Sequence, residues 1–169
     1  MKKIFVIIAL LLIGLSLTRK VHASMADISD LRVQKEIEAA QERIIKIETV
    51  RKYLKKHNSE LAAYSEKLVK EAEKNEIPWH LVAAISGVES TFCKRIPYES
   101  YNCWGWNNGN TYFKDYEDAI TIVSTTLGKK YFGRGLDTPE KIAPVYAPPS
   151  HTWAGKVRWF MAQIESSKS

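Results

Sequence analysis

Residues 77–90 read IPWHLVAAISGVES, and the interpretation of the whole chain begins with them. Pro78 is suited to the first position of a helix, because its missing N–H needs no partner there. The positions that make this helix apolar on most of its circumference are Leu81, Val82, Ala84, Ile85 and Val88. Such a helix is expected to be buried in the core of its domain. Its last residues, Glu89 and Ser90, place a carboxyl group at the edge of that core.

Helical patterns continue on both sides of this stretch, so the fold class is expected to be mainly α. The predicted helices with their capping residues run from Asn58-Ser59 to about Asn75, from Asp115 to Tyr131, from Thr138 to about Tyr146 and from Ser150 to Ile164. Residues 91–110 are irregular and aromatic, and Thr111–Lys114 is predicted as a short strand, which allows a small β-hairpin. We therefore expect residues 59–169 to form one helical domain.

Residues 24–58 are predicted to form a helical stalk before that domain. The segment Asp27–Lys56 contains no Gly or Pro. The apolar residues at its a and d heptad positions are Val33, Ile37, Ala40, Ile44, Ile47 and Leu54. This seam is about three heptads long, the lower limit for a coiled coil. A single amphipathic helix, free or packed on the domain, is favoured, and a homodimer through the helix is the alternative.

The first 23 residues have the composition of an export signal. Of the formal net charge of +6, four charges lie there, on Lys2, Lys3, Arg19 and Lys20. An apolar segment of 14 residues, Ile4–Leu17, follows the first two lysines, and Val21-His22-Ala23 fits a signal-peptidase site. The segment is short for a membrane span of roughly 20 residues. Arg19-Lys20 is unusual after a cleaved signal. An uncleaved anchor, in which residues 4–17 tether the protein to a membrane, therefore remains an alternative.

This distribution of charge predicts an exported protein that does not bind nucleic acid. With the signal removed, the net charge is only +2. A near-neutral domain lacks the broad basic surface that the phosphate backbone requires. The expected location is extracellular, periplasmic or associated with the cell envelope.

The two cysteines, Cys93 and Cys103, are predicted to form a disulfide, because export exposes them to an oxidising compartment. Their spacing does not match a zinc site, and the histidines are scattered, so no metal is expected. No phosphate-binding loop or other cofactor motif is present, so no cofactor is expected.

The chemistry is predicted to lie at Glu89 and in the aromatic loop that follows it. A carboxyl beside apolar surface is poorly solvated, which raises its pKa and suits a general acid. Trp104 and Trp106 flank Gly105, with Asn102, Asn107 and Asn108 beside them. Aromatic faces stack on sugar rings and amides bind hydroxyl and acetamido groups, although one of the two tryptophans is expected to fill the core. Alternatively, Glu89 is an ordinary helix-end glutamate turned to solvent.

Four segments in order resemble the lysozyme-like superfamily. Residues 76–92, EIPWHLVAAISGVESTF, resemble its catalytic-helix motif, in which a helix ends in Glu-Ser followed by a hydrophobic residue. The other three are NCWGWN (102–107), YFKDYEDAI (112–120) and VYAPP (145–149). The first two are similar to segments of the cell-wall N-acetylglucosaminidase branch. The third, VYAPP, lies where these families place a tyrosine near the active site. Lytic transglycosylases usually carry a Gly-Leu-Met-Gln-type stretch where this chain has Trp104–Asn107, so the product stays open.

The resemblance implies cleavage of β-1,4 bonds between the amino sugars of peptidoglycan. Glu89 would protonate the glycosidic oxygen, and Tyr146 would orient the substrate or stabilise charge. The residues expected to bind substrate are Ser90, Asn102, Trp104, Gly105, Trp106 and Asn107. Hydrolysis would need a second carboxylate, for which the candidates are Glu99, Asp115, Glu117 and Asp118. Without one, the muramic acid 6-hydroxyl attacks internally and an anhydro sugar forms.

Two other classes of protein remain as alternatives. A cysteine peptidase would use Cys103 as nucleophile and His151 as base, which requires a free thiol. A non-catalytic wall-binding or scaffold protein would carry a degenerate domain of the same fold on its helical stalk.

Overall fold

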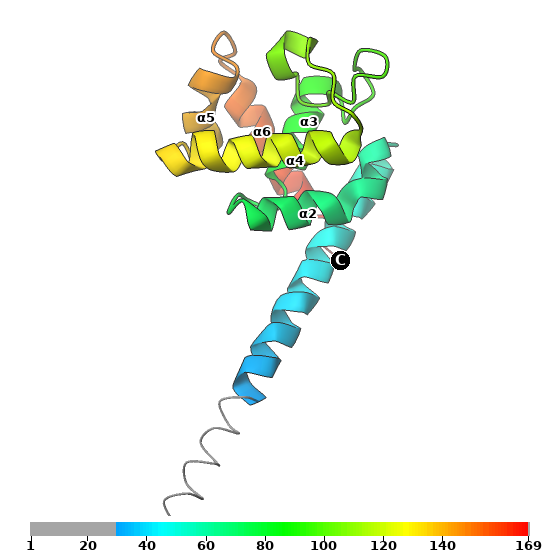
Figure 1. The fold of residues 1–169 in the computed structure, drawn as a ribbon, viewed down its shortest axis with the longest axis vertical. Helices are drawn as coiled ribbons and strands as arrows, with labels where there is room; N and C mark the ends of the chain where they lie inside the picture. The colour runs from blue at the N-terminus through cyan, green and yellow to red at the C-terminus, as the bar shows by residue number, and fades with distance from the viewer. Residues whose placement is uncertain (1–29, 169) are drawn as a thin grey trace, which may run out of the picture. The chain divides into compact units, whose positions relative to one another are not determined.

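The computed structural model describes residues 30–168, which form helices joined by turns and loops (Figure 1). The predicted mainly α class is confirmed for this part of the chain. The predicted strand at Thr111–Lys114, and the β-hairpin with it, is wrong, since no strand occurs among the described residues. Phe113 N–H donates to the Ser100 carbonyl at 2.9 Å, but Asp115 caps a helix immediately afterwards. The segment is therefore too short for a ladder of strand hydrogen bonds.

Residues 30–56 are helical, and the described chain divides into two compact units within this helix, Met1–Glu42 and Arg43–Ser169. In the second unit, the helix buries Val50, Tyr53 and Leu54 in the core. In the described part of the first unit, Leu31, Val33 and Ile37 are exposed. The compact unit therefore includes residues 43–56, which the sequence analysis placed in the stalk. The predicted signal in residues 1–23 lies outside the described residues, and no described helix is long and apolar enough to cross a membrane.

Two short segments lead from this helix to the central one. Ser59 Oγ accepts from Leu61 N–H at 3.2 Å, as predicted for an N-cap, and opens the 3₁₀-helix η1, Glu60–Tyr64. The helix α2, Ser65–Lys74, continues from η1. The central helix α3, Leu81–Ser90, begins after a turn in which Leu81 N–H donates to the Pro78 carbonyl at 2.9 Å. Pro78 thus precedes the helix by one turn instead of starting it.

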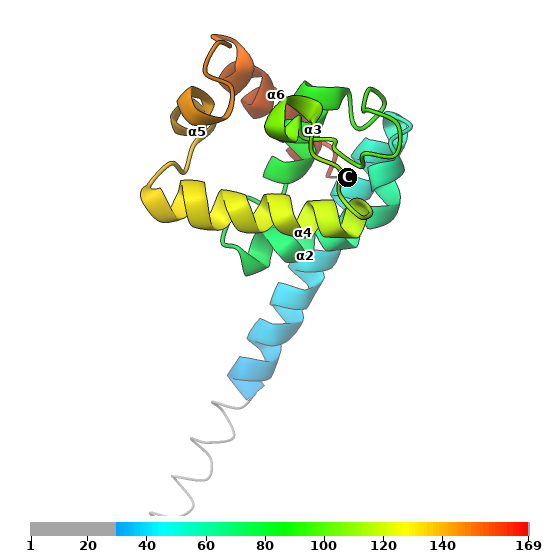
Figure 2. The ribbon, with the colours of Figure 1, turned by 45° about the horizontal axis from the view of Figure 1, so that its top comes forward.

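α3 lies in the middle of the second unit, as its apolar circumference predicted. All residues from Leu81 to Gly87 are buried. The helices around it are α4 (Tyr116–Thr126), extended by η3 (Leu127–Tyr131) and η4 (Phe132–Arg134), then α5 (Pro139–Tyr146) and α6 (Trp153–Glu165). Both views show α4 beside α2, and α6 between α5 and α3 (Figure 1, Figure 2).

Local capping residues explain the starts of α4 and α5, as Ser59 does for η1. Asp115 Oδ1 accepts from Asp118 N–H at 2.8 Å, and Thr138 Oγ1 from Lys141 N–H at 3.3 Å, so both predicted caps are confirmed. The predicted cap at Ser150 is wrong. Ser150 N–H donates to the Ala147 carbonyl at 2.9 Å within the preceding turn, and α6 begins later, after Thr152.

Candidate active site

Glu89 lies in the last turn of α3, half-buried at the edge of the core. Trp153 Nε1, in the first turn of α6, donates to Glu89 Oε1 at 2.6 Å. Burial raises the pKa of the Glu89 carboxyl above its ordinary value, and the hydrogen bond from Trp153 opposes this shift by stabilising the anion. The carboxyl group is therefore held in place and keeps its proton to a higher pH than an exposed glutamate does.

The chain reverses sharply directly after Glu89 and Ser90. Thr91, Phe92 and Cys93 have φ angles of 56°, 58° and 68°, in the left-handed region that residues with a Cβ seldom occupy. A disulfide joins Cys93 to Cys103, as predicted, with 4.6 Å between their Cα atoms. Ser90 Oγ donates to the Cys103 carbonyl at 2.8 Å and accepts from Cys93 N–H at 2.9 Å. The buried Ser90, predicted to bind substrate, thus ties the end of α3 to the aromatic loop.

The aromatic loop, residues 102–111, is closed by Asn102. Its Nδ2 donates to the carbonyls of Trp106 at 2.9 Å and Thr111 at 3.0 Å, and its Oδ1 accepts from Trp106 N–H at 2.9 Å. The side chain is buried, so its amide serves the loop's own backbone. Asn102 therefore shapes the wall of the site.

Gly105 brings this loop against Glu89. A Cβ at Gly105 would lie 2.7 Å from Glu89 Oε2, and the residue has a φ of 64°. Both the close approach and the left-handed backbone require glycine here. The loop backbone consequently lies directly over the carboxyl group.

Trp104 and Tyr146 link the loop to α3 and α5. Trp104 is fully buried, and its Nε1 donates to the Val82 carbonyl at 2.9 Å, so it is the tryptophan that fills the core. Tyr146 Oη donates to the Trp104 carbonyl at 2.7 Å, and its ring stacks on that of Trp153 with 5.0 Å between centroids. Burial raises the pKa of Tyr146 well above its ordinary value, and the charge of Glu89 raises it further. Tyr146 thus remains a hydrogen-bond donor near the carboxyl.

A cavity of about 200 Å³ opens on the outer side of Gly105. Its lining residues are Trp104, Gly105, Trp106, Asn107, Asn108, Tyr131 and Tyr146. Trp106 is half-buried and meets Tyr146 edge to face with 5.9 Å between centroids, while Asn107 and Asn108 are exposed. The cavity therefore offers an aromatic wall and exposed amides. Glu89 is not itself a lining residue, and its connection to the cavity is Gly105, which lines the cavity and lies against the Glu89 carboxyl group.

The four candidates for a second carboxylate lie elsewhere. Asp115 caps α4, and Asp118 Oδ2 accepts from Lys114 N–H at 3.2 Å. Glu99 and Glu117 are exposed. No Asp or Glu is among the residues that line the cavity.

Both cysteines of the chain are in the disulfide, and no free cysteine remains. The peptidase alternative therefore has no nucleophile at Cys103. The described residues also contain no group of acids, histidines and cysteines that could hold a metal ion.

Two residues at the site were missed from the sequence: Trp153 and Tyr131. Trp153 lies four residues before Val157, so helical spacing alone indicated a buried position on α6. Nothing in the sequence connects it with Glu89, which is 64 positions away. Tyr131 was predicted only on the apolar face of its helix, whereas Asn108 was expected beside the tryptophans and does line the cavity.

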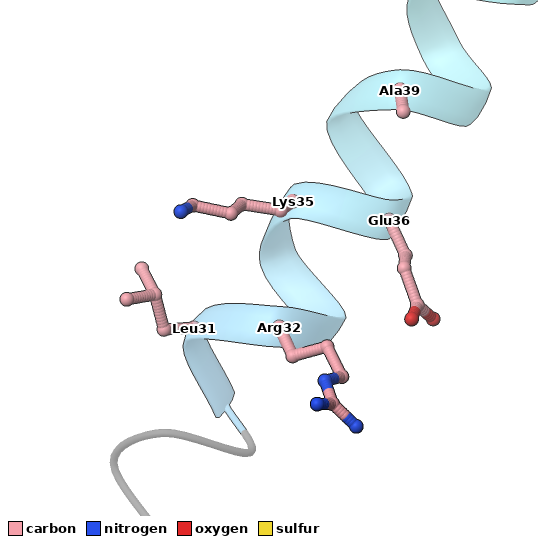
Figure 3. Close-up of a pocket in the computed structure, with 5 residues that line it drawn as sticks. All are labelled: Leu31, Arg32, Lys35, Glu36 and Ala39. Atoms are coloured by element: carbon pink, nitrogen blue, oxygen red, sulfur yellow. The ribbon is translucent and has the colours of Figure 1, made fainter.

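A second hollow, of about 380 Å³, lies along the N-terminal helix (Figure 3). Its named lining residues come from that helix, and the side chains of Leu31 and Lys35 point away from those of Arg32 and Glu36 (Figure 3). No polar groups converge there, and we assign no site to it.

A comparison with protein-family models finds no match to this chain. A search among curated proteins likewise finds no significant match. The candidate site therefore rests on its own geometry.

Proposed function

We propose that the chain is an exported murein hydrolase with a lysozyme-like catalytic domain, which cleaves β-1,4 bonds of the peptidoglycan glycan strand. The observation that carries this proposal is the position of Glu89. Its carboxyl is half-buried, bonded to Trp153 at 2.6 Å, and covered by Gly105 beside an open cavity. A carboxyl with a raised pKa at such a place is suited to protonate a leaving oxygen.

The wall of the cavity supports a sugar substrate. Trp106 and Tyr146 present aromatic surface, on which the apolar face of a pyranose ring can stack. Asn107 and Asn108 are exposed at the same cavity, where their amides can bind hydroxyl or acetamido groups. The disulfide supports export, because such bonds persist in oxidising compartments.

Of the two products left open by the sequence, the positions of the four candidate carboxylates favour the anhydro sugar. Inverting and retaining hydrolases both place a second carboxylate across the scissile bond. Of the four candidates, Asp115 and Asp118 make hydrogen bonds at the start of α4, and Glu99 and Glu117 are exposed. Internal attack by the muramic acid 6-hydroxyl requires one group, Glu89, which first donates a proton and then accepts one.

The test is digestion of purified peptidoglycan by wild type and Glu89→Gln, with mass analysis of the fragments. We expect the variant to lose about 10²–10⁴-fold in rate, the usual contribution of a general acid. Glu38→Gln, which removes an exposed carboxylate of the N-terminal helix, is the matched control and should digest normally. Fragments ending in anhydro-muramic acid support the internal route, whereas reducing N-acetylglucosamine ends support a glucosaminidase.

Unchanged digestion by Glu89→Gln would overturn the catalytic assignment. Absence of digestion by the wild type, together with retained binding to the wall, would instead support the scaffold alternative.

A further inference from the structure

We propose that a groove on α6, separate from the Glu89 cavity, binds a peptide-bearing amino sugar of the same glycan strand. The residues that define this α6 groove are His151, Thr152, Gly155, Lys156, Trp159 and Phe160. Its volume is about 550 Å³. The inference rests on the proposed function for the identity of its ligand.

The groove has an aromatic surface that is anchored in the core. Trp159 is 55% exposed, which is unusual for so large an apolar side chain. Its ring meets that of Phe160 at 4.8 Å between centroids, and Phe160 meets the buried Phe92 at 5.0 Å. Trp159 is therefore supported by packed rings and offers a face for a sugar ring to stack on.

Gly155 leaves the middle of the groove open. It lies inside α6, where glycine costs about 0.5–1 kcal/mol relative to alanine. A Cβ there would have no atom within 4 Å, so no packing contact requires glycine. Because Gly155 has no side chain, a ligand can reach the helix surface beside Trp159.

Lys156 gives the groove a positive charge. Thr152 is the N-cap of α6, yet its side chain makes no capping hydrogen bond. Lys156 takes part in no ion pair among the described residues, and the lining contains no acid. An anionic group next to the sugar would complement Lys156, and the stem peptide of peptidoglycan carries carboxylates.

The groove is continuous along the chain with the Glu89 site. His151 and Thr152 directly precede Trp153, whose Nε1 holds Glu89. Phe160 also lies against α3, since a Cβ at Gly87 would be 3.2 Å from its ring. α6 thus contributes residues to both places, and the ligand proposed for the groove is the part of the glycan strand next to the sugar at Glu89.

The test uses full-length protein carrying Glu89→Gln, so that ligands are bound without being cleaved. The probes are the neutral tetramer of N-acetylglucosamine and a peptidoglycan fragment of two disaccharides with their peptides, titrated by calorimetry. We expect Trp159→Ala to weaken both about tenfold. Gly155→Leu should also weaken both probes, because the leucine side chain fills the groove. Leucine favours the helix more than glycine does, so a weaker affinity would not come from an unfolded α6. Lys156→Gln should weaken only the peptide-bearing fragment, by about three- to tenfold.

Gln163→Ala, an exposed change on α6 outside the groove, is the control and should change neither affinity. If both probes bind but Trp159→Ala and Gly155→Leu leave their affinities unchanged, the groove is not a glycan site, although the proposed function stands. Failure of both probes to bind also overturns the inference.

If the probes bind in a way that depends on Trp159 but the wild type digests no peptidoglycan, the α6 groove is a glycan site and the proposed function is wrong. A concentration-dependent dimer that Trp159→Ala abolishes would show that a second copy covers the groove, and would overturn the glycan assignment.

Discussion

Glu89 experiences two opposing influences on its proton. Burial disfavours the anion, whereas the Trp153 hydrogen bond stabilises it, and burial is the stronger effect. The carboxyl is thus held by a donor without losing its raised pKa. This combination depends on neighbours from three segments, namely α3, the aromatic loop and α6.

The raised pKa of Glu89 predicts a pH-dependent gain in stability for Glu89→Gln. The folded chain binds the Glu89 proton more tightly than the unfolded chain does. The free energy of unfolding therefore falls as pH rises from the ordinary pKa of glutamate to the raised one. We expect the Tm of the variant to exceed that of the wild type by about 1–3 °C at neutral pH and to match it near pH 3.

Thermal unfolding between these pH values checks the prediction, with Glu99→Gln as the control for loss of one exposed carboxylate. A difference in Tm that shrinks as pH rises would contradict it.

Gly105→Ala is expected to destabilise the fold and to displace the Glu89 carboxyl. The substitution strains a left-handed backbone, and it also places a methyl group 2.7 Å from Oε2 of Glu89. Gly135→Ala is the matched control, since its φ is 76° but its Cβ would meet nothing within 4 Å. We expect about 1 kcal/mol of loss for the control and about 1–2 kcal/mol more for Gly105→Ala, measured by denaturant unfolding. Equal losses would show that Glu89 moves aside freely.

At the scale of elements, the loop after α3 depends on cross-links between segments. Left-handed angles at Thr91, Phe92 and Cys93 are unfavourable for residues with side chains, by roughly 1–2 kcal/mol each. The disulfide and the Ser90 hydrogen bonds hold this conformation and so keep Gly105 over Glu89.

Replacing both Cys93 and Cys103 with alanine should lower the free energy of unfolding by about 2–3 kcal/mol, the loop-closure effect of a short disulfide loop. If the proposed function holds, the rate of peptidoglycan digestion should fall even under conditions in which the double variant is fully folded, because the relaxed loop no longer covers Glu89. Unfolding curves and digestion rates with and without reductant measure both effects. Reductant should affect the wild type and leave the double variant unchanged, and an active, equally stable double variant would contradict the prediction.

At the scale of the whole molecule, the N-terminal helix has two parts with different roles. Residues 43–56 supply core side chains to the second unit, among them Val50 and Leu54, which are fully buried. In residues 30–42 the side chains of Val33 and Ile37 are exposed. The predicted homodimer through this exposed seam stays a prediction.

A chain that starts at Arg43 is expected to keep the Tm of the full protein within about 2 °C. A chain that starts at Ser59 loses the burial of Val50, Tyr53 and Leu54, each worth about 1.5–3 kcal/mol. That sum is comparable with the total stability of a domain, so we expect no cooperative unfolding transition. Calorimetry of both truncations checks this. A large, concentration-dependent drop in Tm for the first truncation would instead indicate a stabilising coiled coil.

Several local features followed from the sequence alone. The caps at Ser59, Asp115 and Thr138 join residues two or three positions apart, so their residue types were sufficient to predict them. The burial of α3 followed from its apolar circumference, and the disulfide from the predicted compartment. The strand at Thr111–Lys114 failed because Asp115 starts α4 directly after it, and the cap at Ser150 failed because the preceding turn includes Ser150.

The sequence by itself thus determined a mainly helical chain with Glu89 at the end of a buried helix. Only the tertiary structure decided what surrounds that carboxyl. It brought Trp153 to Glu89 and Tyr146 to the Trp104 carbonyl, across 64 and 42 positions. It also turned the polar groups of Ser90 and Asn102 towards backbone partners. Local hydrogen bonds depend on adjacent residues, whereas these contacts depend on how α5, α6 and the loop pack around α3.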